Sequence, residues 1–142
     1  MTTASGEHLV ADFRHCHGDQ STVRMALWKT ASLDGPASKG IVADHVYKHI
    51  SEDIRCILGV TGSRLVFLDR MLWVCSVDIN TYDGSCYSRH FFLPSDFLGG
   101  DVDVGVLALV TSERHVVFAK DGELAVITGG MDFEDIVRLE KQ

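Results

Sequence analysis

The stretch at residues 63–97 constrains the fold most, because it holds the densest apolar runs of the chain and reaches one of its two prolines. It reads SRLVFLDRMLWVCSVDINTYDGSCYSRHFFLPSDF. Trp73, Cys75 and Val77 recur with the period of two that is typical of a β-strand with one apolar face. Pro94 cannot donate a backbone hydrogen bond, so it ends the last strand of this stretch. The pattern predicts consecutive strands followed by an abrupt turn.

The same signals predict short strands along most of the chain. We expect them at residues 22–28, 55–60, 65–68, 73–79, 85–93, 104–110, 114–120 and 123–128. Asp83-Gly84 and Asp121-Gly122 favour hairpin turns, since both residue types tolerate positive φ. Short helical segments are predicted near residues 41–51, directly after Pro94, and within the amphipathic tail. The predicted fold class is therefore mainly β, an antiparallel meander of about eight short strands with one or two short helices.

The 142 residues fit a single domain. We expect a flexible or irregular segment at residues 1–20, one β domain at residues 21–130, and a tail at residues 131–142 that could form a short helix. The strands are expected to close a compact sandwich or an open barrel. A partial propeller of roughly two to three blades is the alternative.

Net charge and the length of the apolar runs argue against two classes of partner. The net charge is −7, with 13 Lys and Arg against 20 Asp and Glu. Phosphate binding needs clustered basic residues, so nucleic acid is not expected as a partner. No apolar run approaches the roughly 20 residues that span a bilayer, so no membrane association is expected either.

The amino terminus and the cysteines indicate a cytoplasmic protein. The start MTTASGEHLVADF lacks the basic and apolar regions of a secretory signal. The four cysteines show no CxxC spacing, which is typical of buried thiols in a reducing compartment. Cys75 and Cys86 flank the predicted hairpin and could pair if the strand register brought them together.

Arg89 and His90 are unusual because they are polar residues within a predicted apolar strand. Burying a charge is costly unless it is paired. Asp69, Asp78 and Asp96 are the possible partners for Arg89. A structural role, in which Arg89 ties a turn and His90 caps a loop, is favoured.

A catalytic interpretation of the same region is the less favoured alternative. It would make His90 a base beside Asp96, with Ser95 or Cys86 as the nucleophile. No catalytic residue is therefore assigned. The ligand or interaction candidates are Trp73, Arg89, His90, Phe92 and Asp96.

The most metal-like run is His15-Cys16-His17. On a strand both imidazoles would project from one face, and His8 could add a third ligand. No fourth ligand has a suitable spacing, so His15 and His17 are only weak candidates. No metal site and no cofactor is predicted.

Several runs are specific enough to carry a family resemblance. They are GSRLVFL from Gly62, WVCS from Trp73, RHFFLP from Arg89 and VVF from Val116. Together with residues 21–28, they resemble the C-terminal WD-repeat-like β-propeller end of fungal NACHT-type signalling NTPases. Lys29 departs from the pattern, since a WD repeat places Asp there.

The resemblance implies recognition rather than chemistry. The chain has no GxxxxGK[ST] loop, so the NTPase part of those larger proteins is missing from it. The expected function is a noncatalytic, intracellular protein–protein interaction or scaffolding module. Its expected partner is another protein, or a second copy bound through open sheet edges. The alternative is a small β-barrel or sandwich that binds an apolar small molecule in a cavity of at least ~300 Å³.

Overall fold

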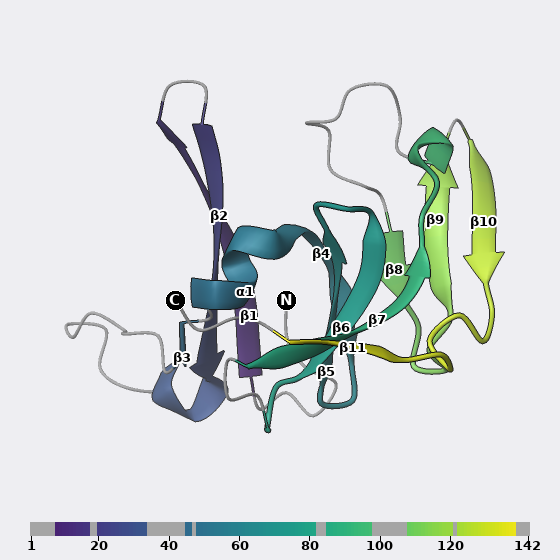
Figure 1. Cartoon of the computed structure of the whole chain (residues 1–142). Helices are drawn as coiled ribbons and strands as arrows, with labels where there is room; N and C mark the ends of the chain where they lie inside the picture. Colours follow the sequence, from purple (N-terminus) through teal and green to yellow (C-terminus); the bar gives the residue numbers. More distant parts are fainter. Residues whose placement is uncertain are drawn as a thin grey trace.

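Three antiparallel sheets make up the computed structural model, which describes residues 8–17, 20–33, 45–46, 48–81, 85–97, 108–120 and 122–138 (Figure 1). Sheet A consists of β1 (His8–His17), β2 (Gln20–Lys29) and β3 (His45–Val46). Sheet B has the order β11 (Asp135–Arg138), β7 (Cys86–Phe92), β6 (Trp73–Asp78), β5 (Arg64–Asp69) and β4 (Ile54–Thr61). Sheet C has the order β10 (Glu123–Ile127), β9 (Val116–Lys120) and β8 (Ala108–Val110). The helical segments are η1 (Thr30–Leu33), α1 (Lys48–Asp53) and η2 (Ser95–Phe97).

Sheet B is a meander from β4 to β7 whose inner strands are covered on both faces. β5 and β6 are buried at nearly every position, as expected for strands between two apolar layers. The β4–β5 turn uses Gly62 at φ +58°, a left-handed conformation that glycine adopts without a Cβ clash. The amide of Leu72 donates to the carbonyl of Asp69 and closes the β5–β6 turn.

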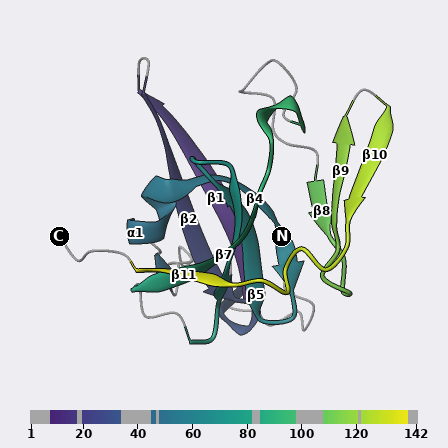
Figure 2. The same ribbon diagram turned by 45° about the vertical axis from the view of Figure 1, so that its right-hand side comes forward.

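Two hydrophobic clusters lie on opposite faces of sheet B. The first joins it to β1, β2 and α1 through residues that include Met25, Leu27, Ile50 and Phe67. The second joins it to sheet C and is built from Cys56, Leu58, Val66, Leu68, Val74, Leu93, Val116, Phe118 and Met131. Sheet B is therefore the middle layer, with the β1–β2 hairpin on one side and sheet C on the other (Figures 1 and 2).

The chain returns to sheet B after β10. Residues 129–134, the return segment, lead into β11, which pairs with β7 at the edge of sheet B. Met131 anchors this segment in the second cluster. The carbonyl of Phe133 contacts the imidazole of His90, and Glu134 forms an ion pair with Arg64. Contacts of Met131, Phe133 and Glu134 thus hold the return segment against the rest of the structure.

The predicted fold class is confirmed, since the chain is mainly β and antiparallel. The strands expected at 22–28, 55–60, 65–68, 73–79, 85–93, 114–120 and 123–128 correspond to β2, β4, β5, β6, β7, β9 and β10. The strand expected at 104–110 corresponds to Ala108–Val110 within the described residues. Residues 41–44, 47, 83–84 and 121, on which other expectations fall, lie outside them.

Two expectations about the ends of the chain are wrong. Irregular structure was expected through residue 20, but His8–His17 form β1, because all ten residues pair in register with β2. The tail at residues 131–142 was expected to be able to form a short helix, but Asp135–Arg138 form β11. The helical spacing of Phe133, Ile136 and Val137 is overridden by the backbone bonds that the edge of β7 offers. In the described part of the chain, no helix has the length and apolar character needed to cross a membrane.

Candidate functional site

Asp69 and Arg89 form an ion pair on the first-cluster side of sheet B, in which the carboxylate is buried and the guanidinium is partly exposed. The Nε and Nη2 atoms of Arg89 donate to Oδ2 of Asp69 at 3.1 and 2.9 Å. The amide of Trp73 donates to Oδ1 of Asp69 at 2.8 Å. Both carboxylate oxygens therefore have donors, which a side chain only 2% exposed requires. Of the three Asp residues considered from the sequence, Asp69 is the partner of Arg89.

Aromatic rings surround the guanidinium of Arg89. Its Cζ lies 5.9 Å from the ring centroid of Trp73 and 6.0 Å from that of Tyr87. Both distances fall within the range of cation–π attraction. Phe92 packs edge-on against Trp73, with ring centroids 6.0 Å apart. Trp73, Arg89 and Phe92, three of the sequence candidates, are thus brought together.

Burial controls the protonation of the groups near this ion pair. It raises the pKa of the Cys75 thiol, and the Asp69 carboxylate adds to the effect. Burial also raises the pKa of Tyr87 to about 12, with a smaller contribution from Asp53. Both groups are neutral at pH 7 and poor nucleophiles. The arrangement therefore fixes the strands and offers no activated group.

His90 lies on the opposite face of sheet B, at a β-bulge in β7. Val74 is opposite Phe91 and Cys75 is opposite Arg89, so His90 is the extra residue in the register. A bulge of this kind changes the direction of a side chain. Here it directs the imidazole toward Ser76, whose Oγ lies 2.8 Å from Nε2 of His90.

The second imidazole nitrogen defines the tautomer. Nδ1 of His90 lies 2.6 Å from the carbonyl oxygen of Phe133, which can only accept, so Nδ1 carries the proton. Nε2 is then an acceptor, and Ser76 donates its hydroxyl proton to it. Burial lowers the pKa of His90, an effect that the Phe133 carbonyl and the Glu134 carboxylate only partly offset. The imidazole is therefore neutral at pH 7.

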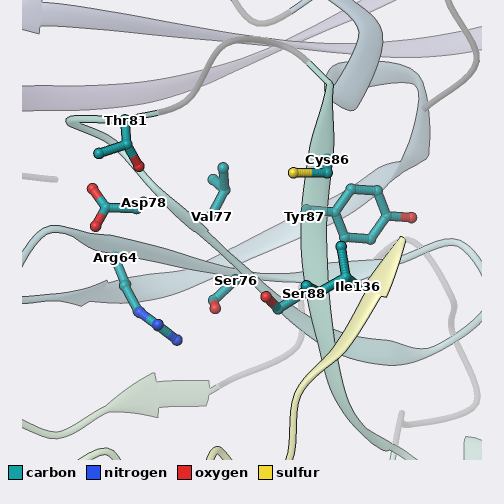
Figure 3. Close-up of a pocket in the computed structure, with 9 residues that line it drawn as sticks. All are labelled: Arg64, Ser76, Val77, Asp78, Thr81, Cys86, Tyr87, Ser88 and Ile136. Carbon is teal, nitrogen blue, oxygen red and sulfur yellow. The ribbon is translucent and has the colours of Figure 1, made fainter. Parts of the chain in front are cut away.

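Ser76 also lines a half-open pocket of about 170 Å³ on the same face (Figure 3). Arg64, Ser76 and Ser88 point toward one another from three neighbouring strands. The other lining residues are Val77, Asp78, Thr81, Cys86, Tyr87 and Ile136. The Arg64 guanidinium is paired with Glu134, and this pairing lowers the pKa of the Glu134 carboxyl. The pocket is small and is lined by both polar and apolar residues.

The catalytic constellation considered from the sequence is not assembled. Ser95 and Asp96 lie exposed on η2, whereas the two ring nitrogens of His90 contact Ser76 and Phe133. Cys86 is exposed and Cys75 is buried, and both thiols are free. The register places Arg89 opposite Cys75, so the hairpin does not bring the two cysteines together.

The weak metal candidates His15 and His17 lie on β1, opposite Thr22 and Gln20. Their side chains are outside the described part of the structure. Among the residues that are described, no group of three or more His, Cys, Asp or Glu side chains could hold a metal ion.

Sheet C carries a surface that sequence reasoning missed. Its inner face packs into the second cluster, and its outer face is apolar at five positions on three adjacent strands. We call this set the outer apolar face: Leu109, Val117, Ala119, Leu124 and Val126. Leu109 and Val126 are both paired with Val117, so they form one row across the sheet. Leu109, Leu124 and Val126 are 53%, 72% and 55% exposed.

The signal for this surface was in the sequence. Leu109, Val117 and Val126 each lie within a nearly continuous apolar run, which predicts a strand covered on both faces. Sheet C has only one such cover in the described structure, so the second apolar face stays open.

Comparison of the chain with protein-family models gave no match, and searches of curated proteins and of solved structures gave none either.

Proposed function

We propose that this chain is a protein–protein interaction or scaffolding module and that the outer apolar face is its binding surface. The carrying observation is the exposure of Leu109, Leu124 and Val126 on one sheet face. Scattered exposed apolar residues are common on proteins, but a contiguous set on adjacent strands is typical of an interface. A partner that presents an apolar sheet or helix face would complete the second layer over sheet C.

The edge strand β10 adds backbone groups to this surface. It is the outermost strand of sheet C among the described residues. Its central residues Leu124, Ala125 and Val126 include no charge and no proline, the usual protection of a free edge. An extended partner segment can pair there, and a second copy of the chain is one such partner.

The family resemblance supports the same function. The chain is built from antiparallel sheets, as a propeller-derived module would be, but the strand numbers of its sheets differ from those of propeller blades. In the proposed assignment the chain is a cytoplasmic WD-repeat-like recognition module, similar to the end of a fungal NACHT-type protein. The alternative, an apolar small-molecule site, gains no support from the 170 Å³ pocket, because Arg64 and Asp78 help to line it.

The test compares wild type with Val126→Lys, which places a charge at the centre of the outer apolar face. The control is Met71→Lys, a change at an exposed residue of the β5–β6 turn. Light scattering with size-exclusion chromatography measures self-association, and affinity purification with quantitative mass spectrometry measures other partners. We expect association that Met71→Lys retains and Val126→Lys loses. Equal binding by all three proteins would contradict the assignment of this face.

A further inference from the structure

Ser76, His90 and the Phe133 carbonyl have the geometry of an activated nucleophile. The Ser76 hydroxyl donates to Nε2 of His90 at 2.8 Å, and Nδ1 of His90 is held at 2.6 Å by the Phe133 carbonyl. A nucleophile on a base, with the base oriented by a third group, is the arrangement used in acyl transfer. The carbonyl fixes the tautomer that leaves Nε2 able to accept the proton.

The three groups come from separate parts of the chain. Ser76 lies on β6, His90 lies on the same face of sheet B at the bulge in β7, and Phe133 belongs to the return segment. Both side chains of the pair are almost fully buried, at 2% and 3% exposure. Burial removes competing water from the hydrogen bond between Ser76 and His90 and keeps the base in its neutral form.

A small pocket adjoins Ser76, so a substrate bound there would lie next to the serine. Ser76 is part of the pocket lining, and the 170 Å³ volume accommodates a short acyl group but no bulky one. Ser88 is opposite Ser76 in the register, so its hydroxyl is an available donor to the reacting oxygen. Arg64, whose guanidinium is paired with Glu134, forms part of the same pocket wall.

We propose that Ser76, with His90 as general base, accepts short acyl groups from small esters bound in this pocket. Oγ of Ser76 forms a bond to the acyl carbon while its proton moves to Nε2 of His90. The ester C–O bond then breaks, and the leaving alcohol takes that proton. Water, deprotonated by His90, subsequently attacks the acyl-serine and releases the carboxylic acid, so Ser76 is regenerated.

This activity is independent of the proposed binding surface. The pocket lies on sheet B, whereas the outer apolar face is the far side of sheet C. The protein could therefore bind a partner without hydrolysing esters, or hydrolyse esters without binding a partner, so the two proposals can fail separately.

The test uses the full chain and p-nitrophenyl acetate, an ester with a short acyl group. Release of p-nitrophenolate is followed by absorbance, and peptide mapping by mass spectrometry locates the acetyl group. We expect acetyl on Ser76 and a rate that Ser76→Ala and His90→Gln each lower by at least about 100-fold. Ser95→Ala, a change at an exposed serine on η2, should leave the rate unchanged.

Two controls keep the test decisive. Ser76→Cys retains a nucleophile at the same position, so it should still be acetylated even if Ser76→Ala is poorly folded. Near-ultraviolet circular dichroism checks the packing of each variant. Acetyl found only on surface lysines, or a wild-type rate equal to that of Ser76→Ala, would overturn the proposal and leave the pair a purely structural link.

Discussion

Removing the guanidinium of Arg89 should be among the most destabilising single changes in this protein. Arg89→Met keeps an unbranched apolar stem between Trp73 and Tyr87 but removes both donors to Oδ2 of Asp69. Asp69 is 2% exposed and then keeps the Trp73 amide as the donor to Oδ1, while Oδ2 loses both donors from the guanidinium. Breaking a buried ion pair from one side costs about 3–5 kcal/mol. That is a large share of the roughly 5–15 kcal/mol that stabilises a typical domain.

The opposite truncation should cost less. Arg89 is 27% exposed, so in Asp69→Asn its guanidinium can turn toward water along a flexible stem. The side-chain oxygen of Asn can accept a hydrogen bond from either Arg89 or the Trp73 amide. The NH2 group of Asn then lies against the remaining donor and cannot accept a hydrogen bond from it. We expect a loss of about 2–3 kcal/mol, close to the value of a hydrogen bond to a charged group. Arg89→Met should therefore lose more free energy of unfolding than Asp69→Asn, because Asp69 is more deeply buried than Arg89.

Urea denaturation followed by circular dichroism and tryptophan fluorescence measures these free energies of unfolding. The double variant, Asp69→Asn with Arg89→Met, should be less destabilised than the sum of the single changes, with a coupling energy of about 0.5–3 kcal/mol. A loss below about 1 kcal/mol for Arg89→Met would refute the reasoning, because that value is typical of solvent-exposed ion pairs.

Further predictions concern His90, which contacts the return segment, and two glycines. The pKa of His90 in the folded protein is lowered from 6.5. As the pH falls, the imidazole of the unfolded chain is therefore protonated at a higher pH than that of the folded chain. The free energy of unfolding should decrease as the pH falls from about 7 through 6.5. Thermal melts should show this slope in wild type and a weaker one in His90→Gln; an unchanged slope would contradict the burial of a neutral imidazole. Gly130→Ala should cost about 1–3 kcal/mol, because an added Cβ would lie 2.7 Å from Ile127 and 2.8 Å from Phe91. Gly62→Ala meets no atom within 4 Å, so its loss should come from backbone strain alone, and chemical denaturation of both variants checks the contrast.

The strands were predictable because alternation and turn residues are local signals. Gly62 and the apolar residues of β5 and β6 define two hairpins without reference to the rest of the chain. The choice of Asp69 over Asp78 or Asp96 was not local. Asp69 lies on β5 and Arg89 on β7, with β6 between them, so the pairing depends on sheet order and register.

The bulge and the tail escaped prediction for related reasons. Strict alternation places Arg89 and His90 on opposite faces but gives no sign that His90 is the extra residue, so its contact with Ser76 could not be expected. Phe133, Ile136 and Val137 have helical spacing, but the β-branched Ile136 and Val137 also favour a strand. Only the vacant edge of β7 decides between the two, and that edge exists only once sheet B is folded.

The pairing of β11 with β7 makes sheet C an insertion between two neighbouring strands of sheet B. Both ends of the inserted strands are therefore tied to the same scaffold. When such a segment unfolds locally, both of its ends stay anchored, so it gains only the conformational entropy of a closed loop. Its local unfolding is therefore less favourable than that of a segment anchored at one end. Hydrogen exchange should consequently find the amides of β9 and β7 protected to a similar degree, as one cooperative unit.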